Sequence, residues 1–539
     1  MAGRNRAMIV TAQPEASEAG AEVLMRGGNA VDAAMAAALV QGVVDPQMCG
    51  IAGFGSCQIY MPRRGVHTFI DFHGKTPKAA RPDMWTDIIE GETRDGFGFV
   101  LKDKVNDLGY QAVTTPGSLK AYHEATSEFG TWDWADICAP AVAQAEQGFI
   151  VRPHVDFWWH SGASFGRADV TDRLAFSKTG REAYFRADGS IKRIGDHVAN
   201  PDLAKTLKLI AEKGPEVFYE GEIAERIAED FRANGGLLSF DDLKDYRTTR
   251  LDPLRFAYRG WELATNHPPG GGIMLNEMMN ILGHFDLAEI GHNTVEYIRV
   301  VAEAMKVATS DKDNHVGDPA FYDVPVERLT SDLHAEAAAR RIKAGKMHHV
   351  ERIGMEESKQ TTHVAVIDAD GNAVTMTHSL GMPSGVITDG LGFMYNGCMA
   401  VFDPRPGRAG SIAPGKSRFS SVCPTLGFCD GDLRLAIGAP GGTQIAMGVM
   451  QATLNVIDHG MTMTEAVSAP RFSATSDIID ITNRIPRYVQ RELIELGYEV
   501  VRNPLNFDIG AVHGIRLTED GRLDGGADPG HDGVAIGVE

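Results

Sequence analysis

The chain has 539 residues, of which 43% are hydrophobic and 23% charged, and these fractions exclude disordered, collagen-like and coiled-coil classes. Its net charge of −20 repels phosphate backbones, so we expect no nucleic-acid partner. The longest apolar stretch, 33–44, is shorter than the roughly 20 residues that a membrane span needs, so we also expect no membrane partner. Because the first residues contain no apolar run of the signal-peptide type, we expect a cytoplasmic protein.

The cysteines and histidines indicate no cofactor. Six cysteines, about 1% of the chain, are too few for a disulfide framework, and none forms a CxxC pair. The spacing of the 18 histidines shows no zinc-site pattern such as HExxH. We therefore expect six reduced thiols, no metal and no other cofactor; the cysteines are Cys49, Cys57, Cys138, Cys398, Cys423 and Cys429.

Two helices are predicted near the N-terminus. The first covers 15–26 and ends at the Gly27-Gly28 pair. Asn29 then caps a second helix over 30–43, whose many alanines predict close packing on several sides. A glycine-rich passage leads from there into a strand at 57–60.

The pattern becomes strand-rich in the last third. Residues 120–350 are predicted to be mostly helical, for example over 202–213. After them, 363–367 and 373–377 flank a tight turn and predict a β-hairpin. Further elements are expected as strands at 391–395, 425–429 and 433–437, followed by a helix over 446–457. We expect the sheets of both parts to share one core.

Two short motifs near the C-terminal end allow more than one chemistry. Pro440-Gly441-Gly442 before a helix could form a phosphate cradle, an oxyanion hole or only a tight turn, and the turn is the simplest interpretation. Ser420 and Ser421 stand at the entrance to a strand, where hydroxyls usually satisfy backbone groups.

The run Thr361-Thr362-His363 suggests a hydrolase. Adjacent strand residues point to opposite faces, however, so His363 is poorly placed as a base for Thr362. If the chain were cut between Gln360 and Thr361, the new α-amine of Thr361 would have a reference pKa of about 8 and could accept the hydroxyl proton. Periodicity alone does not suggest such a cut.

The stretch 361–380, TTHVAVIDADGNAVTMTHSL, resembles the start of the small subunit of the γ-glutamyltransferases, which are N-terminal-nucleophile amidohydrolases. Other family-like motifs follow in the family's order over essentially the whole chain, at 19–47, 114–118, 268–273, 317–329, 418–425 and 438–442. The resemblance implies an α/β fold of the four-layer αββα sandwich type. In it, a large subunit, 1–360, mostly helical but part of the sheet core, and a small subunit, 361–539, form one shared body.

The resemblance also implies a self-processing enzyme. Thr361 would attack the carbonyl of Gln360 and cut the precursor. The freed Thr361 would then attack a substrate amide and form an acyl-enzyme, which water or an acceptor amine resolves. Ser379 stands where the family has a threonine that supports the nucleophile, and it keeps the hydroxyl.

Four further residues acquire roles from the resemblance. Gly441 and Gly442 match the glycines of the oxyanion hole. Ser420 and Ser421 match the serine pair that binds the carboxylate end of the substrate.

Departures from the family pattern concern the glutamyl head group. His73 replaces an arginine that holds the α-carboxylate, Gly381 replaces an asparagine, and Val401 replaces an aspartate that pairs with the α-ammonium. A buried ion pair that loses one partner costs about 3–5 kcal/mol. We therefore expect an amidohydrolase for a different, small carboxylate- or acyl-amide, similar to oxamate amidohydrolase-like or cephalosporin acylase-like enzymes. His73, with Lys75 nearby, is expected to help Ser420-Ser421 hold a small carboxylate.

Two alternatives remain open. One is a true γ-glutamyl hydrolase or transferase for glutathione-like substrates with a rebuilt binding site, and the other is an unprocessed, non-catalytic binding or scaffold protein. For the enzyme we expect a small-molecule amide as substrate. We also expect the two processed chains to form a heterodimer, alone or as a dimer of heterodimers.

Overall fold

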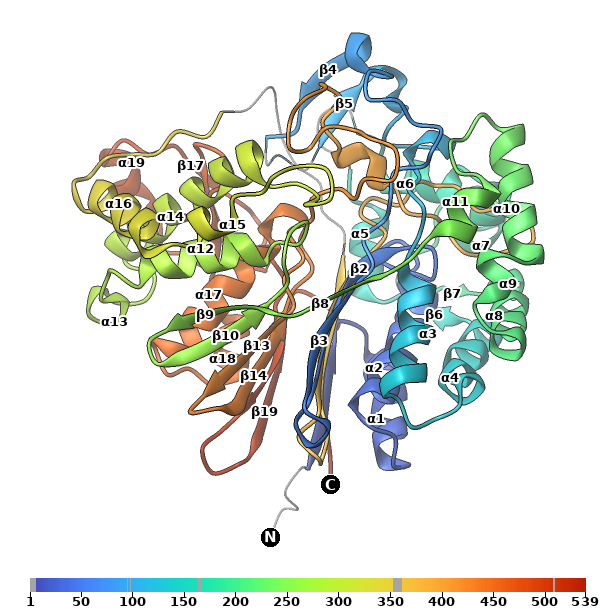
Figure 1. Ribbon diagram of the computed structural model, residues 1–539, viewed down its shortest axis with the longest axis horizontal. Helices are drawn as coiled ribbons and strands as arrows, with labels where there is room; N and C mark the ends of the chain where they lie inside the picture. The colour runs from blue at the N-terminus through green and yellow to red at the C-terminus, as the bar shows by residue number, and fades with distance from the viewer. Residues whose placement is uncertain (1–5, 95, 97, 163–166, 352–360, 508) are drawn as a thin grey trace.

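The computed structural model describes the whole chain except residues 1–5, 95, 97, 163–166, 352–360 and 508. Two large β-sheets lie face to face at the centre, and helices cover the outer face of each sheet (Figure 1). This arrangement confirms the expected four-layer αββα sandwich. The first strand pairs with the last one, so residues 7–11 lie beside residues 534–538.

The first sheet has seven strands in the order β20-β1-β11-β12-β2-β3-β8, and every neighbouring pair is antiparallel. Its strands come from both halves of the chain, and the β11–β12 hairpin lies in the middle. They are β1 (Ala7–Thr11), β2 (Phe54–Met61), β3 (Val66–Asp71), β8 (Thr249–Leu251), β11 (Thr362–Ile367), β12 (Ala373–Ser379) and β20 (Val534–Val538).

The second sheet has six strands in the order β19-β18-β14-β13-β10-β9. They are β9 (Leu254–Tyr258), β10 (Trp261–Thr265), β13 (Thr425–Cys429), β14 (Asp432–Gly438), β18 (His513–Leu517) and β19 (Leu523–Ala527). Small side chains such as Ala365 and Ala436 lie in the cluster between the sheets. The approach is so close that a Cβ on Gly438 would stand 2.2 Å from the ring of His363.

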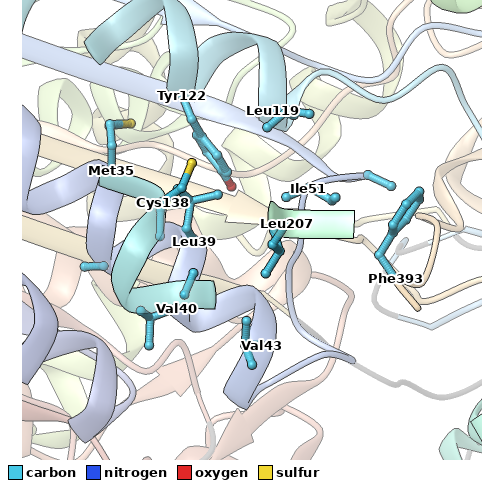
Figure 2. Packing of buried hydrophobic residues seen from close by; sticks show 14 of the residues in the cluster. Met35, Leu39, Val40, Val43, Ile51, Leu119, Tyr122, Cys138, Leu207 and Phe393 are labelled. Carbon is cyan, nitrogen blue, oxygen red and sulfur yellow. The ribbon is translucent and has the colours of Figure 1, made fainter. Parts of the chain in front are cut away.

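The alanine-rich helix α2 (Ala30–Val44) is almost entirely buried, as its composition predicts. Asn29 caps it in a reciprocal pair with Asp32, so the expected cap is confirmed. Figure 2 shows Met35, Leu39, Val40 and Val43 gathered with side chains of α3 (Ser118–Phe129), α4 (Trp134–Gln147) and α8 (Pro201–Lys213).

The remaining elements complete the outer layers. On the side of the first sheet are α1 (Pro14–Met25), α5 (Pro153–Trp159), α6 (Val170–Ala175), α7 (Lys178–Tyr184), α9 (Glu216–Tyr219), α10 (Glu222–Ala233) and α11 (Phe240–Asp245) (Figure 1). On the side of the second sheet are α12 (Gly272–Leu282), α13 (Leu287–Ile290), α14 (Val295–His315), α15 (Val326–Leu329), α16 (Asp332–Lys343), α17 (Ile445–Ile457), α18 (Met463–Ser468) and α19 (Arg487–Glu495). Short strands are β4 (Ile89–Glu92), β5 (Phe99–Leu101), β6 (Phe149–Ile150), β7 (His197–Val198), β15 (Phe472–Ser473), β16 (Ile479–Ile481) and β17 (Val500–Arg502).

Most of the predicted elements are present within one to three residues of their expected ends, but the strand expected at 391–395 is wrong. That segment is irregular. Tyr395 shares backbone hydrogen bonds with Ser384 and Val386, and an isolated bridge joins Pro383 and Asn396, but the segment forms no strand. Its apolar side chains are buried because they pack in the helical layer with α2, α8 and α10, not because they pair in a sheet. The first two-thirds of the chain was predicted to be mostly helical, but it also supplies strands to both sheets.

All six cysteines are free thiols. In the part of the chain that the structure describes, no helix is both long and apolar enough to cross a membrane. The cytoplasmic location stays a prediction.

Candidate active site

Thr361 lies directly before β11, and its side chain faces the last residue of β12. The hairpin register pairs Thr362 with His378, so the next position brings Thr361 opposite Ser379. Thr361 is only 4% exposed, and its Oγ lies 3.2 Å from the Ser379 Oγ. The Ser379 Oγ also accepts a hydrogen bond of 2.8 Å from the backbone N–H of Gly381, so its proton is able to point toward Thr361. The pair expected from the sequence is therefore brought together.

His363 and Thr362 have hydrogen-bond partners other than Thr361. His363 Nδ1 lies 2.9 Å from Thr377 Oγ, and Thr362 Oγ accepts hydrogen bonds from Gln13 and Gln41. Burial lowers the pKa of His363 to about 3, so the ring is neutral at neutral pH. A base for Thr361 must therefore come from elsewhere, and its own α-amine after a cut is the group that chemistry offers.

Gly441 and Gly442 form the turn between β14 and α17. Their φ angles are 138° and 55°, a region that favours glycine, and a Cβ on Gly441 would stand 2.9 Å from the Cα of Gly510. Each glycine lines a hollow that Thr361 also lines. The turn and the oxyanion-hole interpretations are thus compatible, because the turn lies beside Thr361.

The first hollow, called here the polar hollow, opens beside Thr361. Ser420 and Ser421, separated from Thr361 by about sixty residues of chain, line it together with Thr361. The backbone N–H of Ser420 donates to the carbonyl of Pro269, which anchors the serine loop. The lining residues are Gly96, Thr361, Val401, Arg418, Phe419, Ser420, Ser421, Gly442, Thr443 and Ile445.

The second hollow, called here the apolar hollow, has mostly apolar and aromatic side chains in its lining. Thr361 lines both hollows, so a polar space and a largely apolar, aromatic one meet at this residue. The lining residues are Met48, Phe157, Trp158, Thr361, Pro440, Gly441, Phe507, Ala511, Gly530 and His531.

Arg418 is a site residue that the sequence analysis missed. Its side chain is buried, lines the polar hollow and lies with its guanidinium carbon 4.5 Å from the centre of the Phe54 ring. The motif RFSSVCPT contains this arginine only two residues before Ser420. The signal was therefore visible, but nothing in the sequence distinguished it from a surface charge.

His73 has a different setting from the one expected. Its Nδ1 lies 2.7 Å from an Asp71 carboxylate oxygen, and its carbonyl accepts a hydrogen bond from the Tyr246 hydroxyl. It is not among the residues that line either hollow. Its role in substrate binding stays a prediction, and so does that of Lys75, whose ammonium lies 5.8 Å from the Tyr246 ring. Gln360, the predicted cleavage residue, lies outside the described residues.

Among the described residues, one group has the composition of a metal site, and it belongs to helices α12, α14 and α16. His334 Nε2 lies 2.8 Å from Glu277 Oε1 and 3.1 Å from Asp311 Oδ2. Hydrogen bonds to Asp311 and Glu277 raise the pKa of His334 to about 9, and burial raises the pKa of Glu277 to about 8. A protonated imidazole between two carboxyl groups accounts for this cluster.

Comparisons with known proteins identify the family of the chain. The profile of the gamma-glutamyltranspeptidase family matches residues 16–538. The Acylase ACY 1 proenzyme of Pseudomonas sp. (strain V22) is 36% identical over 99% of this chain and 94% of its own. The glutathione hydrolase proenzyme of Bacillus subtilis (strain 168) is 32% identical over 98% and 91%. The crystal structure of a cephalosporin acylase from Bacillus halodurans superimposes with a TM-score of 0.86 and 27% identity over 99% of this chain and 96% of that one.

Proposed function

Since this chain belongs to the gamma-glutamyltranspeptidase family and is therefore an amide hydrolase, we propose that Thr361 becomes its N-terminal nucleophile after self-cleavage. The observation that carries the proposal is the place of Thr361. Its hydroxyl faces Ser379 and stands where the polar and apolar hollows meet, beside the Gly441-Gly442 turn. The family resemblance recognised in the sequence is confirmed by these relatives.

Maturation would use the same hydroxyl as turnover. Thr361 Oγ attacks the carbonyl carbon of Gln360, the peptide C–N bond breaks, and the chain is held briefly by an ester. Water hydrolyses that ester, leaving a carboxylate on Gln360 and a free α-amine on Thr361. The "proenzyme" names of the acylase and glutathione hydrolase relatives support this step.

In turnover, the α-amine of Thr361 accepts the hydroxyl proton while Oγ attacks the substrate carbonyl. The N–H groups of Gly441 and Gly442 stabilise the oxyanion, for which one donor typically contributes about 3–4 kcal/mol. The amine product leaves with the proton, and water or an acceptor amine then releases the acyl group. Ser379 supports the nucleophile by a hydrogen bond to Oγ.

The two hollows suggest how a substrate lies. We assign the acyl group to the polar hollow because the serine pair is there, and the amine part to the apolar hollow with Phe157 and Trp158. Val401 lines the polar hollow without a charge for an α-ammonium, which favours an acyl group other than γ-glutamyl.

The two chains would stay associated after the cut. Residues before 361 supply β1, β2, β3 and β8 of the first sheet, and residues from 361 onward supply β11, β12 and β20. Separation would therefore break the hydrogen bonds of several buried strand pairs. A heterodimer is the assembly that this interleaving supports.

Intact-mass analysis of the wild type and of Thr361→Ala tests the proposal. The wild type should give chains of about 39 and 19 kDa, when 58.3 kDa is divided in proportion to length, whereas Thr361→Ala should stay whole and inactive. Thr361→Ser, which keeps a hydroxyl, is the matched control and should still be cut. A wild type that turns over amides while uncut would contradict the mechanism, and one that is uncut and inactive would favour a scaffold.

A further inference from the structure

The strand that carries the nucleophile outruns one of its two neighbours. β1 pairs with β11 along its length, and the last pair joins Thr11 to Val364. Thr362 and His363 therefore lie beyond the end of this ladder, although β12 still pairs with them on the other side. After self-cleavage Thr361 would be a chain end, and the end of an element opens more easily than its middle. The nucleophile thus depends on whatever holds Thr362 and His363 in place of β1.

The side chain of Gln41, on α2, occupies that position. Its Nε2 lies 3.0 Å from Thr362 Oγ and 3.2 Å from the carbonyl oxygen of His363. It also donates to Gln13 Oε1 at 2.6 Å, and the Thr362 hydroxyl lies 3.2 Å from the same oxygen. All four residues are fully buried. Side-chain amides therefore supply the hydrogen bonds that a longer β1 would give.

His378 and Tyr122 fix the orientation of the Gln41 amide. The His363 carbonyl oxygen only accepts hydrogen bonds, so the Gln41 amide nitrogen faces β11 and its Oε1 faces His378. Burial lowers the pKa of His378 to about 3, so its ring is neutral and has one N–H. That N–H is at Nε2, which lies 2.8 Å from Gln41 Oε1, and the Tyr122 hydroxyl donates to Nδ1 at 2.7 Å.

Asp45 fixes the second amide in a similar way. Gln13 Nε2 donates to an Asp45 carboxylate oxygen at 2.6 Å, so Gln13 Oε1 faces Gln41. The other Asp45 oxygen accepts from the Gln47 side chain. From Tyr122 to Asp45 the buried network has a consistent set of donors and acceptors, and such a network rigidifies its surroundings.

We propose that Gln41 is a positioning residue for the nucleophile. Through Thr362 and the His363 carbonyl it holds the end of β11, so that the α-amine and Oγ of Thr361 keep the geometry that proton transfer needs. This inference rests on the proposed function for the identity of the nucleophile and its base. A displacement of about 1 Å at reacting groups can cost about 100-fold in rate. Gln41 would belong to the large chain and Thr362 to the small one, so the positioning acts across the cut.

The test removes the contact from either side in the mature enzyme. Thr362→Val keeps the shape of the side chain and should lower kcat for glutaryl-p-nitroanilide about tenfold with little change in KM. Thr362→Ser keeps the hydroxyl and should restore kcat. Gln41→Met should be slower than Thr362→Val, because it also loses the His363 contact. The double variant should be no slower than Gln41→Met alone, since both changes remove one shared contact.

Thr375→Val is the matched control, because it removes another buried hydroxyl from the same hairpin. The Thr375 hydroxyl donates to the carbonyl of Ile437 at 3.2 Å, in the other sheet and away from the end of β11. This variant should lower the melting temperature about as much as Thr362→Val and leave kcat unchanged. Equal kcat losses in Thr362→Val and Thr375→Val, or losses that multiply in the double variant, would overturn the inference.

Hydrogen exchange gives an answer that does not need turnover. In Gln41→Met the amides of residues 362–364 should exchange about tenfold faster than in the wild type, whereas those of residues 373–377 in β12 should not change. Unchanged exchange at 362–364 would show that Gln41 does not hold the end of β11. A wild type that stays uncut and inactive would refute the proposed function instead, and the exchange comparison on that uncut chain would still decide the role of Gln41.

Discussion

The hydroxyl of Thr361 lies 3.2 Å from that of Ser379, although 18 residues of chain separate them. The distance follows from the β11–β12 hairpin, in which each residue of one strand faces a defined residue of the other. Thr361, directly before β11, and Ser379, the last residue of β12, therefore lie at one end of a hairpin in the middle of the sheet, where strand pairing on both sides restricts movement.

Ser379→Ala should slow both self-cleavage and turnover. It removes a donor to the Thr361 oxygen, and a hydrogen bond that strengthens in the transition state typically contributes about 2–3 kcal/mol, or roughly 30- to 150-fold in rate. Ser379→Thr keeps the hydroxyl and should remain close to the wild type. The rate of appearance of the small chain and the kcat of the mature enzyme are the two measurements. An unchanged kcat in Ser379→Ala would remove Ser379 from the site.

Gly442→Val should abolish turnover more completely than it lowers stability. A side chain at φ 55° strains the turn and crowds the acyl group, so the backbone N–H groups no longer point at the oxyanion. Gly460→Ala is the control for backbone strain alone, because Gly460 has φ 65° and a Cβ there would meet nothing within 4 Å. Melting temperature and kcat are compared for both. If Gly442→Val melts early yet keeps its kcat, the segment is only a turn.

γ-Glutamyl-p-nitroanilide should be a poor substrate compared with glutaryl-p-nitroanilide, from which it differs only by the α-ammonium. An ammonium buried without a partner costs about 3–5 kcal/mol, which corresponds to a rate ratio of at least about 100. Val401→Asp should narrow that ratio, because it gives the ammonium an acceptor and neutralises Arg418 in the same hollow. Hydrolysis of glutathione with kcat/KM of about 10⁴ M⁻¹s⁻¹ or more by the wild type would show that the pocket is a glutamyl site.

Acid should destabilise the fold through His363 and His378. Burial lowers the pKa of both rings from 6.5 to about 3, so the folded state holds them neutral while the unfolded state binds a proton below pH 6.5. Their contribution is complete above pH 6.5 and is lost as pH falls toward 3, by up to about 1.4 kcal/mol per pH unit and histidine. Asp45 acts in the opposite sense, because burial raises its pKa from 3.8 to about 7.

Urea unfolding between pH 4 and 7 measures this dependence, in the Thr361→Ala background where both parts remain one chain. His378→Gln should reduce the slope of unfolding free energy against pH. An unchanged slope would mean that His378 takes up its proton in the folded state as easily as in the unfolded one.

Local patterns in the sequence were enough to predict several helices and strands and to recognise the family motifs of the site. Alternation on both sides of a tight turn predicts the hairpin around 368–372, and Asn29 before an alanine run predicts the buried helix α2. These features follow from contacts within a few residues, since turn chemistry, capping and side-chain periodicity act over that range. The motif at 361–380 likewise pointed to Thr361 and Ser379, which the hairpin brings together.

Only the tertiary structure decided which residues from distant parts of the chain lie next to one another. The apolar segment 391–395 has the composition of a strand, but it has no strand partner and packs in the helical layer instead. His73 lies against Asp71, whereas Val401 and the loop that carries Arg418 and Ser421 converge beside Thr361. A charge becomes a candidate anchor only when burial removes water and no neighbour neutralises it. Whether a side chain is buried, and which groups surround it, depends on contacts between segments that are far apart in the chain. Both properties therefore follow from the packing of the layers.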